Sequence, residues 1–198
     1  MAFTFFFRDR HTLERLTQQV VPDFKNSRTI KVWDAGCAMG PEPYTFAMIM
    51  AEEMGGDYSR VKFIATDIDD TSNFKEIVIN GIYPYSDLSR MPEEIFKKYF
   101  TKMEDGRFKI VDSILNSLEY HIHDLLTLEP IDTNFHAVLC KNVLLHFHPD
   151  QRIEVIKMFH KVLVEGGYLC TEQTQAMPEE CKHLFTRVVS DANVYKKI

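Results

Sequence analysis

The sequence has no long apolar run, no excess of basic residues and only four cysteines. No stretch approaches the roughly 18 to 20 apolar residues of a transmembrane helix, so we expect no membrane span. The apolar opening at residues 3–7 is cut short by Arg8 and lacks a basic leader, which argues against a signal peptide. The net charge of −6 disfavours a nucleic-acid partner, because phosphate binding needs a concentrated basic surface.

The cysteines share no C-x-x-C spacing, and they are Cys37, Cys140, Cys170 and Cys181. We interpret them as reduced, buried thiols of a cytoplasmic protein. Two H-x-H pairs, His121/His123 and His146/His148, have the spacing that places both rings on one side of a strand. No third ligand is evident beside either pair, and we therefore expect no metal site.

A chain of 198 residues with 45% apolar residues can bury the core of one α/β domain. Predicted strands alternate with predicted helices, which indicates a mostly parallel sheet with helices on both faces, a Rossmann-like fold. The predicted strands are 29–33, 61–66, 118–123, 135–140 and 168–171, and the predicted helices are 10–25, 41–54, 70–80 and 149–164. Pro41 suits the first position of its helix.

Residues 82–118 interrupt this alternation and predict a small subdomain inserted into the single domain 1–198. It contains a short helix at 92–99 and a strand pair, 99–103 and 107–111, joined by an Asp-Gly hairpin signal. In the helix at 149–164, one stripe carries Ile153, Ile156, Phe159 and Leu163, and Gly166-Gly167 is predicted to close it. A short helix from Pro178 and a strand pair at 187–189 and 194–197 complete the chain.

The turn at residues 34–40 follows the first strand and leads into a helix, the place where such sheets bind ligands. Gly36 and Gly40 would let the backbone approach a ligand closely. The turn has neither G-x-G-x-x-G nor G-x-x-x-x-G-K-[ST], which disfavours a dinucleotide or a nucleoside triphosphate. Asp67, ending the next strand, is placed to accept hydrogen bonds from both ribose hydroxyls. A nucleoside without phosphates fits best, S-adenosylmethionine being the commonest; the alternative is a structural turn with a helix-capping aspartate.

Six segments, in order along nearly the whole chain, resemble the catalytic domain of chemotaxis-receptor glutamate methyltransferases of the CheR type. They are Thr4-Phe5-Phe6-Phe7-Arg8-Asp9 (T-x-F-F-R-[DE]), Gly40-Pro41-Glu42-Pro43-Tyr44-Thr45 (G-E-E-P-Y-S), Ala65-Thr66-Asp67-Ile68-Asp69 (A-[ST]-D-I-D), Gly81-Ile82-Tyr83 (G-x-Y), Cys140-Lys141-Asn142-Val143-Leu144-Leu145-His146-Phe147 (C-R-N-V-[LM]-I-Y-F) and Val194-Tyr195-Lys196-Lys197 (V-Y-R-K). The resemblance implies an S-adenosylmethionine-dependent methyltransferase whose acceptor is a protein glutamate, in the cytoplasmic part of a chemoreceptor-type protein.

The resemblance also implies roles for individual residues. Arg8 would orient the acceptor and, with Thr4, approach the methionine part of the cofactor. Glu42 would hold the amino or carboxylate end of the cofactor, and Asp67 the ribose. The residues expected to frame the adenine or to line the floor beneath the sulfonium are Asp124, Leu125, Lys141 and Asn142.

The acceptor side departs from the family pattern. Lys141 stands where the family has arginine, His146 where it has an acceptor-side tyrosine, and residues 171–174 where it has G-H-S-E. The family's helical N-terminal domain has no counterpart in the 198 residues. His146 could donate a hydrogen bond to the acceptor as the tyrosine would, or be a structural histidine. A regulatory protein that binds the cofactor without transfer, and a small-molecule methyltransferase, are therefore alternatives to the protein methyltransferase.

Overall fold

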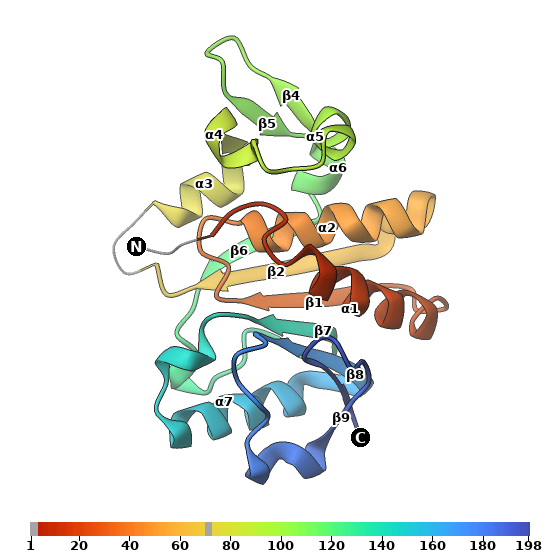
Figure 1. Ribbon diagram of the computed structural model, residues 1–198, viewed down its shortest axis with the longest axis vertical. Coiled ribbons are helices and arrows are strands. Elements are labelled where there is room, and N and C mark those ends of the chain that lie inside the picture. Colours follow the sequence, from red (N-terminus) through yellow and green to blue (C-terminus); the bar gives the residue numbers. More distant parts are fainter. Residues whose placement is uncertain (1–3, 70–72) are drawn as a thin grey trace.

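The computed structural model describes residues 4–69 and 73–198, and its centre is a seven-stranded sheet (Figure 1). The first five strands in spatial order are parallel and the last two are antiparallel to their neighbours, which confirms the predicted mostly parallel sheet. In spatial order they are β6 (Leu118–Ile122), β2 (Val61–Asp67), β1 (Ile30–Ala35), β7 (Phe135–Cys140), β8 (Leu163–Thr171), β10 (Val194–Lys197) and β9 (Phe185–Arg187).

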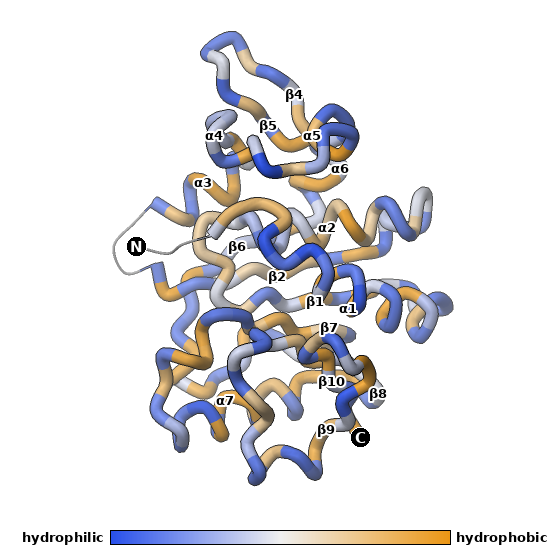
Figure 2. Tube along the Cα trace, in the orientation of Figure 1, coloured by the Kyte–Doolittle hydropathy of each residue, from blue (hydrophilic) through white to orange (hydrophobic). Residues whose placement is uncertain are grey.

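Helices cover both faces of this sheet because its inner strands present apolar side chains to both sides. In β1, Val32 belongs to the core cluster under α1 (Arg10–Asp23) and α2 (Pro41–Met54). Its neighbour Trp33 belongs to the opposite cluster, under α7 (Pro149–Val162). Along α7, hydrophilic and hydrophobic residues alternate (Figure 2), as the predicted amphipathic stripe requires. The remaining helix near the sheet is α3 (Phe74–Asn80), and short 3₁₀ turns lie at η1 (Gly55–Arg60), η2 (Leu125–Thr127), η3 (Leu144–His146) and η4 (Glu179–Leu184).

The prediction that Gly166-Gly167 closes the helix at 149–164 was wrong. The helix ends at Val162, and Leu163 already begins β8, which contains both glycines. Gly166 has a φ of +71°, and the β7–β8 register shifts between Phe135 and Ala137, so the glycines serve a bulge in the sheet. The segment predicted as a helix from Pro178 is the 3₁₀ turn η4. The strand predicted at 187–189 lies at Phe185–Arg187 and shares only Arg187 with the prediction.

Residues between α3 and β6 form a second, three-stranded sheet at one end of the molecule (Figure 1). Its antiparallel strands are β3 (Ile82–Tyr83), β5 (Phe108–Ile110) and β4 (Phe100–Lys102), and the short helices beside them are α4 (Tyr85–Leu88), α5 (Glu93–Tyr99) and α6 (Asp112–Leu115). The predicted hairpin is confirmed by the β4–β5 pairing. Its tip is largely hydrophilic (Figure 2).

Among the described residues, no helix combines the length and the apolar character needed to cross a bilayer. All four cysteines are buried and unpaired with one another.

Candidate functional site

A cavity of about 780 Å³ lies at the carboxyl ends of β1, β2, β6 and β7. Such edges of parallel sheets are where α/β proteins bind ligands, and the volume falls in the range of small-molecule sites. The cavity brings together all but one of the residues singled out from the sequence: Thr4, Arg8, Gly36, Glu42, Asp67, Asp124, Leu125, Lys141, Asn142 and His146. Residues from five separate segments of the chain therefore line one cavity.

The turn after β1 is built around Gly36, whose φ is +107°. Its amide donates to Thr66 O at 2.8 Å, which ties the turn to the end of β2. A Cβ at this position would lie 2.1 Å from Cγ2 of Val143, in the loop after β7. The sequence predicts that the backbone at Gly36 approaches a ligand closely. In the structure it closely approaches Val143, in the loop after β7 that forms part of the cavity wall.

Gly40 does not line the cavity. It is the residue before α2, with a φ of +93°, and Pro41 takes the first helical position as predicted. A Cβ on Gly40 would lie 2.9 Å from the Tyr83 hydroxyl and 3.1 Å from Cγ2 of Val78. Glycine is required here by packing against the small sheet and by backbone conformation, so a ligand contact at this position has no structural support.

Asp67 ends β2 and lines the cavity. Its Oδ2 accepts a hydrogen bond from the Ala38 amide at 2.8 Å, and its Oδ1 accepts one from the Asp69 amide at 3.2 Å. The Ala38 amide fixes the carboxylate against the turn after β1, and the Asp69 amide holds it from the segment after β2. Each carboxylate oxygen has a second lone pair for a further donor, so a fixed acceptor pair remains for a vicinal diol.

Lys141 is the centre of a buried charge network in the cavity wall. Its side chain is only 2% exposed, and its Nζ lies 2.6 Å from Asp9 Oδ2 and 2.8 Å from Glu42 Oε2. Burial by itself lowers the pKa of Lys141, but the charges of Glu42 and Asp9, together with nearby Cys170, outweigh burial and raise it. Lys141 is therefore a fixed cation that holds the acid of α2 to the acid preceding α1.

Asp34 lies behind this network and is fully buried at the end of β1. Burial, reinforced by the charge of Glu42, raises the pKa of its carboxyl well above the usual range, although Lys141 acts in the opposite direction. Its Oδ2 has no hydrogen-bond partner among the described residues. The raised pKa favours the protonated, uncharged form of this carboxyl beneath the site.

The N-terminal segment closes one side of the cavity and is anchored by its aromatic residues. Phe6 is fully buried and meets Tyr83 edge-on, with ring centroids 4.9 Å apart. The Phe7 amide donates to Thr45 Oγ1 at 3.1 Å. The Phe5 ring packs against the Arg90 guanidinium at 4.6 Å. These contacts hold Thr4 and Arg8 at the cavity wall.

Two predicted site residues lie at the edge of the cavity. His146 is exposed at the end of η3. Asp124 precedes η2 and uses Oδ1 to cap that turn, accepting from the Leu126 amide at 2.9 Å. The carboxylate of Asp124 is thus partly committed to shaping the loop, and Leu125 is buried beneath it.

Asp9 and His123 both line the cavity, and neither was predicted from the sequence to do so. Asp9 follows Arg8 in the opening motif, but only the fold reveals its contact with Lys141, 132 residues away along the chain. His123 lines the cavity beside Asp124; its Nε2 lies 2.7 Å from Glu129 O, and its buried Nδ1 has no partner in the part of the chain described.

The polar residues of the cavity fit S-adenosylmethionine. The cavity provides a fixed acid at the end of β2 for a ribose diol, and Glu42 in the first turn of α2 for the ammonium of the amino-acid end. The turn after β1 packs its glycine closely against Val143. No group of three or more potential metal ligands is found among residues 4–69 and 73–198.

Comparison with known proteins agrees with this geometry. The family model described as CheR methyltransferase, SAM binding domain, matches residues 2–194. A probable chemotaxis protein methyltransferase of Rhizobium etli is 29% identical over 195 residues, covering 94% of this chain and 72% of the relative. The chemotaxis protein methyltransferase of Vibrio anguillarum is 30% identical over 179 residues, covering 88% of this chain and 64% of the relative. The chain thus spans about two thirds of the length of these relatives.

Solved structures support the fold. The protein PKMT2 of Rickettsia typhi, in complex with AdoHcy, is similar with a TM-score of 0.52 and 16% identity, covering 86% of this chain and 26% of that one. A TehB-like SAM-dependent methyltransferase of Corynebacterium glutamicum gives a TM-score of 0.50 and 13% identity, covering 94% and 85%. The match over nearly the whole chain decides the family: this chain belongs to the CheR methyltransferases, as their S-adenosylmethionine-binding domain.

Proposed function

We propose that this protein transfers a methyl group from S-adenosylmethionine to the side-chain carboxylate of a glutamate in a chemoreceptor-type protein. The observation that carries the proposal is the cavity itself, which gathers Arg8, Glu42, Asp67 and Lys141 from four distant segments. Relatives named as chemotaxis protein methyltransferases support the choice of acceptor.

The cofactor supplies an activated methyl group on a sulfonium. The acceptor carboxylate is already ionised at neutral pH, so the reaction needs little acid–base help and depends on alignment and exclusion of water. Arg8 lines the cavity and carries a guanidinium, whose planar geometry suits a carboxylate. In this proposal Arg8 orients the acceptor, while Asp67 and Glu42 hold the cofactor.

His146 takes the place of the family's tyrosine at the exposed edge of the same cavity. An imidazole can donate one hydrogen bond, as a phenol does, but on a shorter side chain. We assign it a secondary role in positioning the acceptor, where a protein segment would enter from solvent.

The test is transfer of a labelled methyl group to receptor cytoplasmic fragments, preceded by calorimetric titration with the cofactor and its demethylated product. We expect binding of both, transfer by the wild type, and loss of transfer in Arg8→Ala. Arg28→Ala, an exposed arginine outside the cavity, is the matched control and should retain transfer. Cofactor binding without transfer to any protein acceptor would contradict the proposed activity.

A further inference from the structure

A second cavity, of about 460 Å³, adjoins the first. The two share the walls formed by Arg8, Asp9, Lys141 and Asn142. The rest of the second cavity is formed by the start of α1 and by the segment that follows β8, with Glu172, Gln173 and Thr174. A group bound there would therefore lie directly beside the residue that orients the acceptor.

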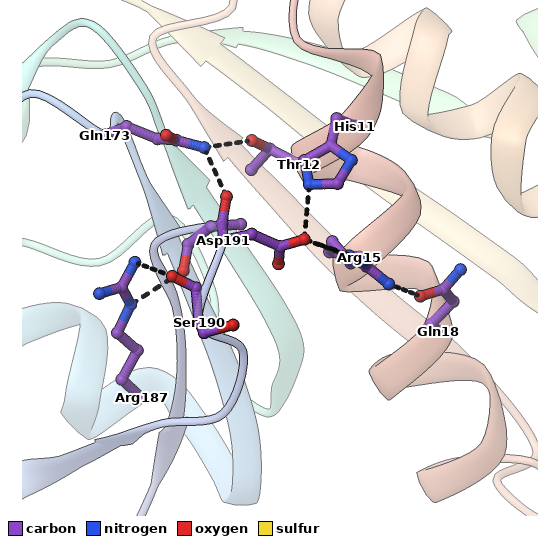
Figure 3. A network of polar contacts seen from close by, with 9 residues as sticks. His11, Thr12, Arg15, Gln18, Gln173, Arg187, Ser190 and Asp191 are labelled. Atoms are coloured by element: carbon purple, nitrogen blue, oxygen red, sulfur yellow. Dashed lines mark hydrogen bonds and ion pairs between the residues drawn. The ribbon is translucent and has the colours of Figure 1, made fainter.

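The two walls of this second cavity are tied together by a polar network (Figure 3). Asp191 Oδ2 lies 2.8 Å from Arg15 Nη2 and 3.0 Å from His11 Nε2, both on α1. The side-chain amide of Gln173 donates to Asp191 O at 3.0 Å and to Thr12 Oγ1 at 3.4 Å. The cavity is thus built between anchored elements and does not depend on a loose surface loop.

Glu172 gives this cavity an unmet hydrogen-bonding capacity. Glu172 is only 4% exposed. Its Oε2 accepts from the Asn142 amide at 3.3 Å, but its buried Oε1 has no partner among the described residues. The other acid in these walls, Asp9, is already paired with Lys141. A buried carboxyl oxygen without a donor is costly, so a ligand that supplies a donor gains free energy once Glu172 turns this enclosed oxygen toward the cavity that it lines.

We propose that the second cavity is a specificity subsite for the methyl acceptor, in which Glu172 accepts a hydrogen bond from an N–H donor near the target glutamate. The donor is the ammonium of a lysine or the carboxamide of a glutamine. This inference rests on the proposed protein-glutamate transfer. It assigns Glu172 to recognition of the acceptor, at a position where the family motif has histidine in place of glutamate.

The test uses peptides with one target glutamate and one variable residue, scanned within about one helical turn on either side. The variable residue is lysine, glutamine or methionine, the last being of similar length without a donor. Two readouts are compared: kcat/KM for methyl transfer, and calorimetric binding of each peptide to protein loaded with the demethylated cofactor. Glu172→Gln is the variant, and Glu180→Gln, an exposed glutamate outside both cavities, is its matched control.

At one or more positions, lysine or glutamine should exceed methionine by about tenfold or more in both readouts, the size expected for a hydrogen bond to a charged group. The lysine advantage should disappear in Glu172→Gln, because the single amide oxygen stays on the Asn142 amide and the NH2 group then faces the lysine ammonium. The lysine advantage should persist in Glu180→Gln. Preference for lysine identifies an ammonium, and preference for glutamine a carboxamide. Cofactor affinity should be unchanged in both variants.

Equal binding of the lysine, glutamine and methionine peptides at every position would overturn the subsite, as would a lysine advantage that survives Glu172→Gln. Absence of transfer to every peptide, with normal cofactor binding, would instead contradict the proposed activity. In that case the binding measurements still decide whether Glu172 recognises an N–H donor.

Discussion

Replacing Lys141 by methionine tests the buried charge network that joins the N-terminal segment to α2. Methionine approximates the volume of the lysine, so the main loss is electrostatic. Removing one partner of a buried ion pair costs about 3–5 kcal/mol. Here the lysine side chain is 2% exposed, but the acids keep some access to water, Glu42 at 19% and Asp9 at 38%. We therefore expect Lys141→Met to lower the free energy of unfolding by about 2–4 kcal/mol.

The two ion pairs of Lys141, with Asp9 and with Glu42, should contribute unequally to the free energy of unfolding. Asp9 is more than a third exposed, so its coupling to Lys141 should be below about 1 kcal/mol. Glu42 is less exposed, and its coupling should be about 1–3 kcal/mol. Double-mutant cycles with Glu42→Gln and Asp9→Asn, measured by urea unfolding near neutral pH, separate the two.

The contribution of Lys141 to the free energy of unfolding should depend on pH in a defined direction. The folded-state pKa of Lys141 is raised, so its stabilising effect is fully present below the unfolded value of about 10.4 and is lost only as pH rises through the folded value. From about pH 6 to 9, titration of this lysine should not change the cost of Lys141→Met. Lys157→Met, which removes an exposed pair with Glu154, is the control and should cost far less stability than Lys141→Met, because water screens the exposed pair. Equal costs for the two variants, or a stronger coupling to Asp9 than to Glu42, would refute the reasoning.

Three further predictions concern the cavity and its surroundings. Asp67→Asn should weaken cofactor binding about 10- to 100-fold by calorimetry; an unchanged affinity would exclude it as the ribose ligand. Gly36→Ala should lower unfolding stability by at least about 1 kcal/mol, because φ is +107° and its Cβ would meet Val143; Val143→Ala should restore part of it. The raised pKa of Asp34 stabilises the fold below its unfolded pKa of about 3.9, and this stability is lost as pH rises towards the folded value. Asp34→Asn should therefore gain stability relative to wild type between about pH 4 and 8 in urea unfolding, and a constant difference would contradict the buried acid.

Patterns that depend on neighbouring residues were sufficient for much of the fold. Apolar periodicity and turn residues predict the helix at 41–54, the strand at 135–140 and the hairpin of the small sheet, and all three are present. The end of the helix at 149–164 was predicted wrongly, because a glycine pair is compatible both with a helix end and with a bulge in a strand. Gly166-Gly167 permits a bulge inside β8, and a sequence pattern cannot distinguish this from a helix end because the partner strand is not visible in it.

The sequence by itself determined the family and ten of the residues that line the cavity, because these depend on short motifs at strand ends. Tertiary structure decided which side chains meet. Lys141 holds Asp9 and Glu42 across 132 and 99 residues of chain, and Gly40 packs beneath Tyr83 outside the ligand cavity. Glu172, at a departure from the family pattern, becomes a buried acceptor only when α1 and the segment after β8 enclose it. Burial and long-range pairing set the chemistry of these groups, and neither is a property of local sequence.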